Sequence, residues 1–254
     1  MFWIPLARFG RAQTVREVLS QVASRYPILE CRGSDAAPAA RILLGCGKPE
    51  QLLPAAEAAL DRITAETALL VDALDAREDI PPGATMRTAA HAARFARAVG
   101  FPPEQAWRFQ QAALWRGVGK LLLDNDLLLK KNLLTYDEWL KIRTYPALGA
   151  DLLIRRGLAD AVIAETVRHH TENYDGTGYP NGLEGPAIPL EARALRVVDV
   201  FCAMTSPRHY RSVHASVPDG LEYLRLHRSS QFDPDLVDRF LAAAADITRE
   251  WPEI

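Results

Sequence analysis

The feature that most constrains the fold is an almost unbroken succession of helical patterns from Ala84 to the end of the chain. The first of these segments is rich in alanine and is closed by Gly100, and the next begins at Pro103, a residue suited to a first helical turn. Thr135, with Glu138 three residues later, forms a capping-box pattern that marks another helix start. The sequence therefore predicts a mainly all-α fold over this part of the chain.

The first 78 residues follow a different pattern. Two short apolar runs, 27–31 and 41–45, are bounded by glycine, proline or serine and are compatible with two short strands. The stretch 79–83 contains two prolines and a glycine and interrupts the helical patterns on either side. We therefore expect a small docking or regulatory unit, α or α/β, at 1–78, followed by a helical domain at 79–254.

The composition excludes several classes of protein. Of the 254 residues, 48% are hydrophobic and 24% charged, as in ordinary globular domains, and the net charge of −2 gives no sign of a DNA-binding protein. The three cysteines form no CxxC pair, which fits a reducing compartment. No apolar run approaches the ~18 residues of a membrane span, and the start does not resemble a signal peptide. We expect a cytoplasmic protein without membrane insertion.

One segment concentrates the ionisable residues. His169, His170 and Glu172 come at the predicted end of a helix, directly before a loop rich in glycine, 175–182. The helix that follows has a single acid, Asp199, inside an apolar run. Because a buried acid needs a partner, the surroundings of Asp199 are the most informative part of the site.

The same segment carries a long signature. Its parts are Tyr174-Asp175-Gly176-Thr177-Gly178-Tyr179-Pro180, Ile188-Pro189-Leu190, Ala192-Arg193, Asp199-Val200-Phe201, Ala203-Met204-Thr205-Ser206 and Phe232-Asp233-Pro234. This signature resembles the HD-GYP family, and weaker matches extend the resemblance over roughly residues 80 to 245. The resemblance implies an HD-domain-like helical bundle from bacteria that hydrolyses cyclic di-GMP with two or three metal ions.

The resemblance also implies a set of metal ligands, most of which this sequence has lost. The positions where the family has ligands and this chain does not are Ala84, Arg116, Gly117, Tyr145 and Thr171. The pair Arg116 and Gly117 replaces the His-Asp doublet of the family. Between His91 and His169 the chain has no histidine, so no alternative register of these helices supplies the missing imidazoles.

The residues that remain are too few for a binuclear site, which needs about six or more protein ligands. We therefore expect no cofactor and no catalysis, with Lys120 and Asp199 as remnants of the catalytic site. Arg116 cannot bind a metal and repels a dication, and we expect it to pair with Asp199 instead. The alternative is an iron or manganese ion held by His169, His170, Glu172 and Asp199.

The ligand-facing part of the family pattern is better preserved. The residues that the resemblance assigns to cyclic di-GMP binding are Lys120, Tyr179, Arg208 and Arg211. Arginine suits this role because its planar fork binds phosphate with two hydrogen bonds and stacks on bases. The loop of Gly178, Tyr179 and Pro180 corresponds to a proposed docking surface for GGDEF-type diguanylate cyclases.

Three functions are left open. The first is a degenerate, inactive HD-GYP protein that acts as a cyclic di-GMP receptor or as a docking module for a protein such as a GGDEF-domain partner. The second is a metal-dependent cyclic di-GMP phosphodiesterase with a reduced metal site. The third is a purely structural interaction protein, and a homodimer is compatible with each of the three.

Overall fold

The computed structural model describes Asp75, Ile80 and residues 83–130, 132–155, 157–206 and 215–248. In these ranges the chain is mainly helical, and its β contacts are two isolated bridges, Asp175 to Glu184 and Arg228 to Phe232. The predicted all-α fold is confirmed for the part of the chain that the structure describes. The two short strands expected at 27–31 and 41–45 lie outside the described residues.

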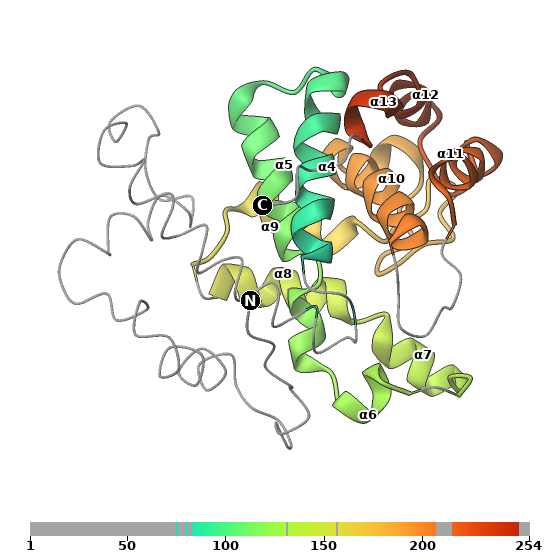
Figure 1. Ribbon diagram of the computed structural model, residues 1–254. Coiled ribbons are helices and arrows are strands. Elements are labelled where there is room, and N and C mark those ends of the chain that lie inside the picture. Colours follow the sequence, from blue (N-terminus) through green and yellow to red (C-terminus); the bar gives the residue numbers. More distant parts are fainter. Residues whose placement is uncertain are drawn as a thin grey trace, which may run out of the picture.

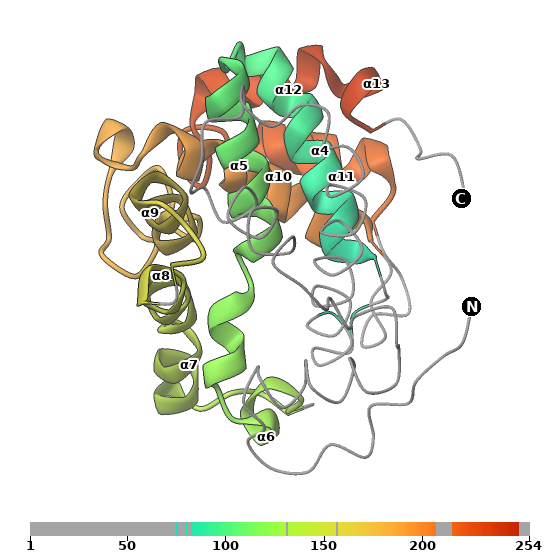
Figure 2. The same cartoon turned by 90° about the vertical axis from the view of Figure 1, so that its left-hand side faces the viewer.

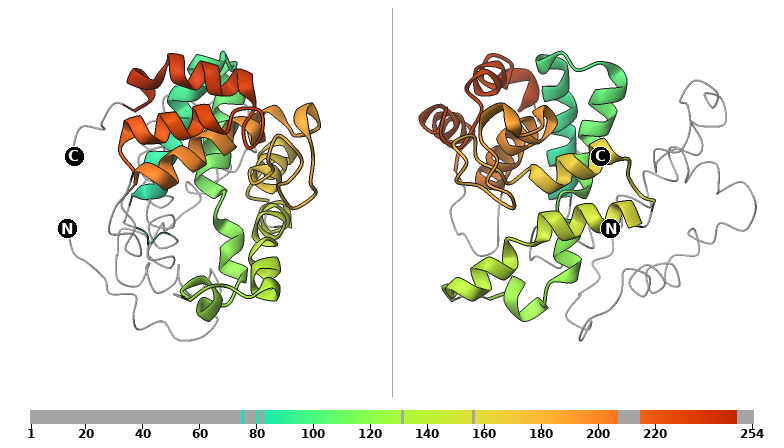
Figure 3. Two further views of the ribbon diagram at one scale, coloured as in Figure 1. Left: turned by 90° about the vertical axis from the view of Figure 1, so that its right-hand side faces the viewer. Right: turned by 180° about the vertical axis from the view of Figure 1, so that it is seen from behind.

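A bundle of helices makes up the larger part of the fold (Figure 1). Its inner members are α4 (Ala84–Val99), α5 (Pro103–Trp115), α9 (Ala161–His169) and α10 (Leu190–Thr205). Its outer members are α11 (Val217–Leu226), α12 (Pro234–Ala242) and α13 (Ala244–Ile247). The outer helices lie along the side of α10 that faces away from α9 (Figure 3).

The remaining helices form an arm at one end of the bundle. They are the 3-10 helix η4 (Val118–Leu122), α6 (Asn125–Leu128), α7 (Tyr136–Ile142) and α8 (Tyr145–Arg155). Figure 2 shows α7, α8 and α9 stacked along one side, with α6 and α7 farthest from α12 and α13. A short 3-10 helix, η5 (Gly185–Ala187), lies in the long connection between α9 and α10.

The core is aromatic at its centre. Phe95, Phe109, Phe201 and Phe240 come from four different helices and are all 0–1% exposed. Phe240 packs edge-on against Phe95 and tilted against Phe201, with ring centroids 5.1 Å and 5.2 Å apart. Because these contacts join α4, α10 and α12, segments far apart in the sequence fix the place of α10, which carries Asp199.

Glycine is required where η4 meets α8. A Cβ atom on Gly119 would lie 1.8 Å from the carbonyl oxygen of Tyr145, a distance that no side chain tolerates. This close approach brings the residues around Lys120 next to the first turn of α8, where Tyr145 lies.

The predicted capping box is present at α7. The Thr135 hydroxyl accepts from the backbone of Glu138, and the Glu138 carboxylate accepts from the backbone of Thr135. The chain starts α7 where the sequence indicates, because these two side chains satisfy backbone donors that the first turn leaves unpaired. Within the described residues, no helix combines the length and the apolarity needed to cross a bilayer.

Candidate functional site

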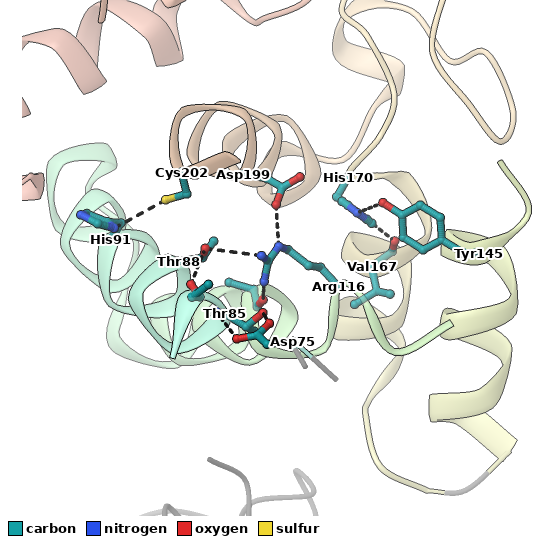
Figure 4. A network of polar contacts seen from close by, with 12 residues as sticks. Asp75, Thr85, Thr88, His91, Arg116, Tyr145, Val167, His170, Asp199 and Cys202 are labelled. Carbon is teal, nitrogen blue, oxygen red and sulfur yellow. Dashed lines mark hydrogen bonds and ion pairs between the residues drawn. The ribbon is translucent and has the colours of Figure 1, made fainter. Parts of the chain in front are cut away.

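The centre of the candidate site is an ion pair between Arg116 and Asp199 (Figure 4). Arg116 follows the last turn of α5, and its Nε donates to Oδ1 of Asp199 on α10 at 2.5 Å. The guanidinium also donates to the carbonyl of Ala113 at 2.8 Å and to the Thr88 hydroxyl at 3.4 Å. The side chains of the pair are 15% and 23% exposed. The sequence-based expectation that Arg116 pairs with Asp199 agrees with this geometry.

The charges of this pair depend on each other. Burial by itself raises the pKa of Asp199, but the charge and hydrogen bond of Arg116 outweigh it, and the pKa lies well below its ordinary value. Burial disfavours the charged form of Arg116 too, yet Asp199 raises the pKa of the guanidinium. The carboxylate is therefore ionised at neutral pH and already neutralised by a cation that belongs to the protein.

The second pair in the site joins His170 and Tyr145. His170 Nδ1 lies 2.6 Å from the carbonyl oxygen of Val167, so Nδ1 carries the proton and Nε2 is the acceptor. The Tyr145 hydroxyl lies 3.0 Å from Nε2 and donates to it. Burial of this ring lowers the pKa of His170 to about 4, although the charge of Asp199 opposes the shift. A bond from Nδ1 to a carbonyl is how a histidine presents Nε2 to a metal, but here Nε2 receives a tyrosine hydroxyl.

The two pairs have a common origin. The family resemblance predicts that Asp199 and His170 are ligand positions that the chain keeps, and that Arg116 and Tyr145 stand at positions where it has lost a ligand. In the structure Arg116 donates to Asp199, and the Tyr145 hydroxyl donates to His170. Each predicted remaining ligand is thus bound by a residue at a predicted lost position.

The other replaced positions lie close by. Ala84, in the first turn of α4, lines a cavity of about 20 Å³ together with Arg116 and Cys202. Gly117 precedes η4 and accepts from the backbone of Lys120 at 3.0 Å. Thr171 donates to the carbonyl oxygen of Tyr179 at 2.8 Å. Thus Ala84 borders the Arg116 side of the site, and Thr171 fixes the loop.

His169 and Glu172 have local partners. His169 Nε2 lies 3.1 Å from a carboxylate oxygen of Glu165, and its Nδ1 lies 3.6 Å from Glu172. The buried Glu172 accepts from the backbone of Asn181 at 2.8 Å and so holds the far side of the loop. These contacts give both residues a structural role, and the assignment of His169 and Glu172 to a metal stays a prediction.

The loop of Gly178, Tyr179 and Pro180 packs tightly against the end of α9. A Cβ atom on Gly178 would lie 2.2 Å from the backbone nitrogen of Asn173, so only glycine fits there. Arg143, next to the end of α7, lies over the ring of Tyr179 at 4.6 Å and donates to the carbonyl oxygen of Gly178 at 2.8 Å. The loop is therefore held from two sides.

The predicted ligand-binding residues are described only in part. The ammonium group of Lys120 lies 5.0 Å from the centre of the Tyr145 ring. The side chain of Tyr179 is partly buried. Arg208 and Arg211 lie outside the described residues. The binding roles of Lys120, Tyr179, Arg208 and Arg211 stay predictions.

Sequence reasoning missed the Tyr145–His170 bond and the position of Arg143. The signal for the first was the exchange of a ligand position for a tyrosine, whose hydroxyl can serve as a donor. Arg143 and Trp139 recur at helical spacing before Tyr145, and this spacing indicates an exposed pair on one face. Nothing in the sequence indicates that the pair meets the loop.

The chain is similar to known proteins in its sequence and in its fold. A family model described as HD domain matches residues 68–236. The chain is 39% identical over 156 residues to the cyclic di-GMP phosphodiesterase response regulator RpfG of Xanthomonas campestris, covering 60% of this chain and 40% of that protein. It is 30% identical over 174 residues to the 3'3'-cGAMP-specific phosphodiesterase 2 of Vibrio cholerae, covering 68% of this chain and 33% of that protein.

Two solved structures share the fold. Bd1817, an HDG"Y"P protein from Bdellovibrio bacteriovorus, superposes with a TM-score of 0.54 at 14% identity, over 88% of this chain and 77% of that one. The phosphodiesterase V-cGAP3 of V. cholerae gives a TM-score of 0.53 at 17% identity, over 72% of this chain and 49% of that one. The chain belongs to the HD domain family. It spans well under half the length of the two sequence relatives.

Membership of this family corrects one prediction. The expectation that the chain has no cofactor is wrong, because the HD-domain phosphodiesterases to which it is related depend on iron or other divalent metals. The error has a physical cause. A count of protein ligands does not decide whether a metal binds, since water and substrate oxygens complete many coordination shells.

Such a metal needs several side-chain ligands directed at one point. No group of three or more histidine, cysteine, aspartate or glutamate side chains within the described ranges is arranged to hold an ion. Asp199 is bound to Arg116, and His170 Nε2 is bound to the Tyr145 hydroxyl. In this conformation the described residues do not fit the metal that the family implies.

Proposed function

We propose that this chain acts in cyclic di-GMP signalling as a degenerate HD-GYP module that binds a ligand or a partner protein without hydrolysing the ligand. The observation that carries the proposal is the ion pair of Arg116 with Asp199. Hydrolysis of a phosphodiester requires cations at the growing negative charge and an activated water. A fixed guanidinium on Asp199 supplies charge, but it cannot activate water, because an arginine stays protonated and has no acceptor.

The names of the relatives support a cyclic dinucleotide as the ligand of this chain. RpfG is called a cyclic di-GMP phosphodiesterase, and the V. cholerae relative is called specific for 3'3'-cGAMP. Both ligands are cyclic dinucleotides with two phosphodiester groups. We assign cyclic di-GMP to this chain, with Lys120 and Tyr179 in the described part of the site and Arg208 and Arg211 completing it.

Calorimetry tests this proposal. We expect cyclic di-GMP to bind the full chain with a dissociation constant in the micromolar range, about −8 kcal/mol. Linear pGpG and GMP serve as controls, and we expect both to bind more weakly, because neither is preorganised as a ring. The absence of heat at high micromolar cyclic di-GMP would remove the receptor function and leave protein docking.

Protein docking is the second part of the proposal. The loop of Gly178, Tyr179 and Pro180 is held rigidly by Thr171 and Arg143, and a rigid loop costs little entropy on binding. A GGDEF-domain protein is the partner we assign to it. We further propose that residues 1–78 are a separate docking or regulatory unit, that homodimers form, and that the chain works in the cytoplasm.

The reduced phosphodiesterase remains the competing function, because its retained residues lie close together. His170 and Asp199 are near enough for each charge to affect the pKa of the other group. If Arg116 and Tyr145 moved aside, the two side chains would face each other across the site. An assay of cyclic di-GMP hydrolysis with added iron(II) or manganese(II) separates the two functions.

A further inference from the structure

Two arginines beside the loop lack the counter-charge that their burial calls for. The first is Arg143, whose guanidinium carbon lies over two aromatic rings, 4.2 Å from the centre of Trp139 and 4.6 Å from that of Tyr179. Within the described residues it donates to a neutral acceptor, the carbonyl oxygen of Gly178, at 2.8 Å. Its Nε is buried and has no hydrogen-bond partner.

The second is Arg196, which lies on α10 one turn before Asp199. It donates from Nη2 to the side-chain oxygen of Asn173 at 2.8 Å, again a neutral acceptor. Its Nε is also buried without a partner. Asn173 and Gly178 belong to the same loop, so the two guanidinium groups hold the loop from α7 and from α10.

Four other partly buried arginines of the described chain are neutralised. Arg108, Arg116, Arg168 and Arg193 each bind a carboxylate. Neither Arg143 nor Arg196 has a carboxylate within ion-pair distance in the described ranges. A partly buried cation without a counter-charge is costly, which is why such groups are usually paired.

The positive charges of Arg143, Arg196 and Lys120 all act on the hydroxyl of Tyr179. Although burial raises the pKa of this hydroxyl, the charges of Arg196, Lys120 and Arg143 all oppose the shift. Among the described residues, Asp199 is an acid that acts on the same hydroxyl, and Asp199 is paired with Arg116. Arg143 and Arg196 therefore place positive charge beside Tyr179.

We propose that Arg143 and Arg196 form an anion subsite beside Tyr179 that binds a phosphodiester group of the ligand. The inference rests on the proposed function, to which it adds two binding residues. A phosphodiester carries one negative charge and two free oxygens, and the guanidinium fork can bind both oxygens. The guanidinium of Arg143 lies over the rings of Trp139 and Tyr179, and these contacts restrict its position.

The test is calorimetry on the full chain with Arg143→Gln and Arg196→Gln, each against cyclic di-GMP and against inorganic phosphate. We expect each variant to weaken cyclic di-GMP binding about 10-fold and to flatten its dependence on salt. Arg196→Lys keeps the charge and is expected to recover part of the loss. The matched control is Arg97→Gln, which removes an exposed arginine of α4 that pairs with Asp246 on α13, and its affinity is expected to stay within twofold of wild type.

The outcomes separate the inference from the proposed function. Wild-type affinity in both variants overturns the inference and leaves cyclic di-GMP binding in place. Binding of phosphate that both variants weaken, without binding of cyclic di-GMP, supports the subsite and removes the assigned ligand. If the wild type binds neither probe, both proposals fail. Thermal unfolding of each variant shows whether a loss of binding comes from a loss of folded protein.

Discussion

Replacing Arg116 with alanine is expected to lower the free energy of unfolding by about 3 kcal/mol at pH 7. The substitution leaves the Asp199 carboxylate, which is 23% exposed, without its cation, and it leaves the Ala113 carbonyl and Thr88 hydroxyl without their donor. Breaking one side of a buried pair costs far more than the pair itself contributes, because the remaining charge stays desolvated. Urea unfolding followed by circular dichroism measures the change.

The control for this prediction is an ion pair at the surface. Arg97 and Asp246 are 66% and 49% exposed, so Arg97→Ala is expected to cost less than about 1 kcal/mol. The double variant Arg116→Met/Asp199→Leu removes both charges and is expected to recover most of the loss. Equal costs for Arg116→Ala and Arg97→Ala would mean that the ion pair does not hold α5 to α10 as described.

Acidification is expected to destabilise the protein through His170 by about 3 kcal/mol between pH 7 and pH 4. Burial lowers the pKa of His170 from 6.5 to about 4, so between these values the unfolded chain binds more protons than the folded one. Stability from this residue is therefore complete above about pH 6.5 and is lost as the pH falls toward 4. The Tyr145 hydroxyl donates to Nε2, and a proton there would remove its acceptor.

Comparison with His170→Gln isolates this effect. Urea unfolding of both proteins is measured from pH 7 to pH 4 in the presence of a chelator, so that protonation alone is followed. The stability of the wild type is expected to fall more steeply, and the difference between the two curves gives the contribution of His170. A constant difference across this range would contradict the assigned tautomer and burial.

Local patterns predicted the helices well. Gly100 ends α4, Pro103 starts α5 and Thr135 caps α7, each at the residue that the sequence indicates. These signals are local, since a cap or a breaker acts within one turn of backbone. At the end of the chain, the helical segment after Pro234 is divided at Ala243 into α12 and α13.

The part of the site that could be predicted is the ion pair, because opposite charges that the fold brings together pair with each other. An arginine and an acid brought to one place by the fold pair with each other, and the family signature indicated that Arg116 and Asp199 meet. The Tyr145–His170 bond and the stacking of Arg143 on Tyr179 were not foreseen. Both depend on how α7, α8 and α9 pack, and the spacing of residues within one helix carries no information about such a crossing.

Hydrolysis of cyclic di-GMP tests the central claim most directly. The full chain, at a concentration equal to that of the ligand, is incubated with iron(II) without oxygen and separately with manganese(II), and the products are separated by liquid chromatography. Because Arg116 forms an ion pair with Asp199, we predict that neither linear dinucleotide nor GMP exceeds the protein-free control over several hours. Conversion of the ligand by the wild type, but not by Asp199→Asn, would show a working metal-dependent site and contradict this account.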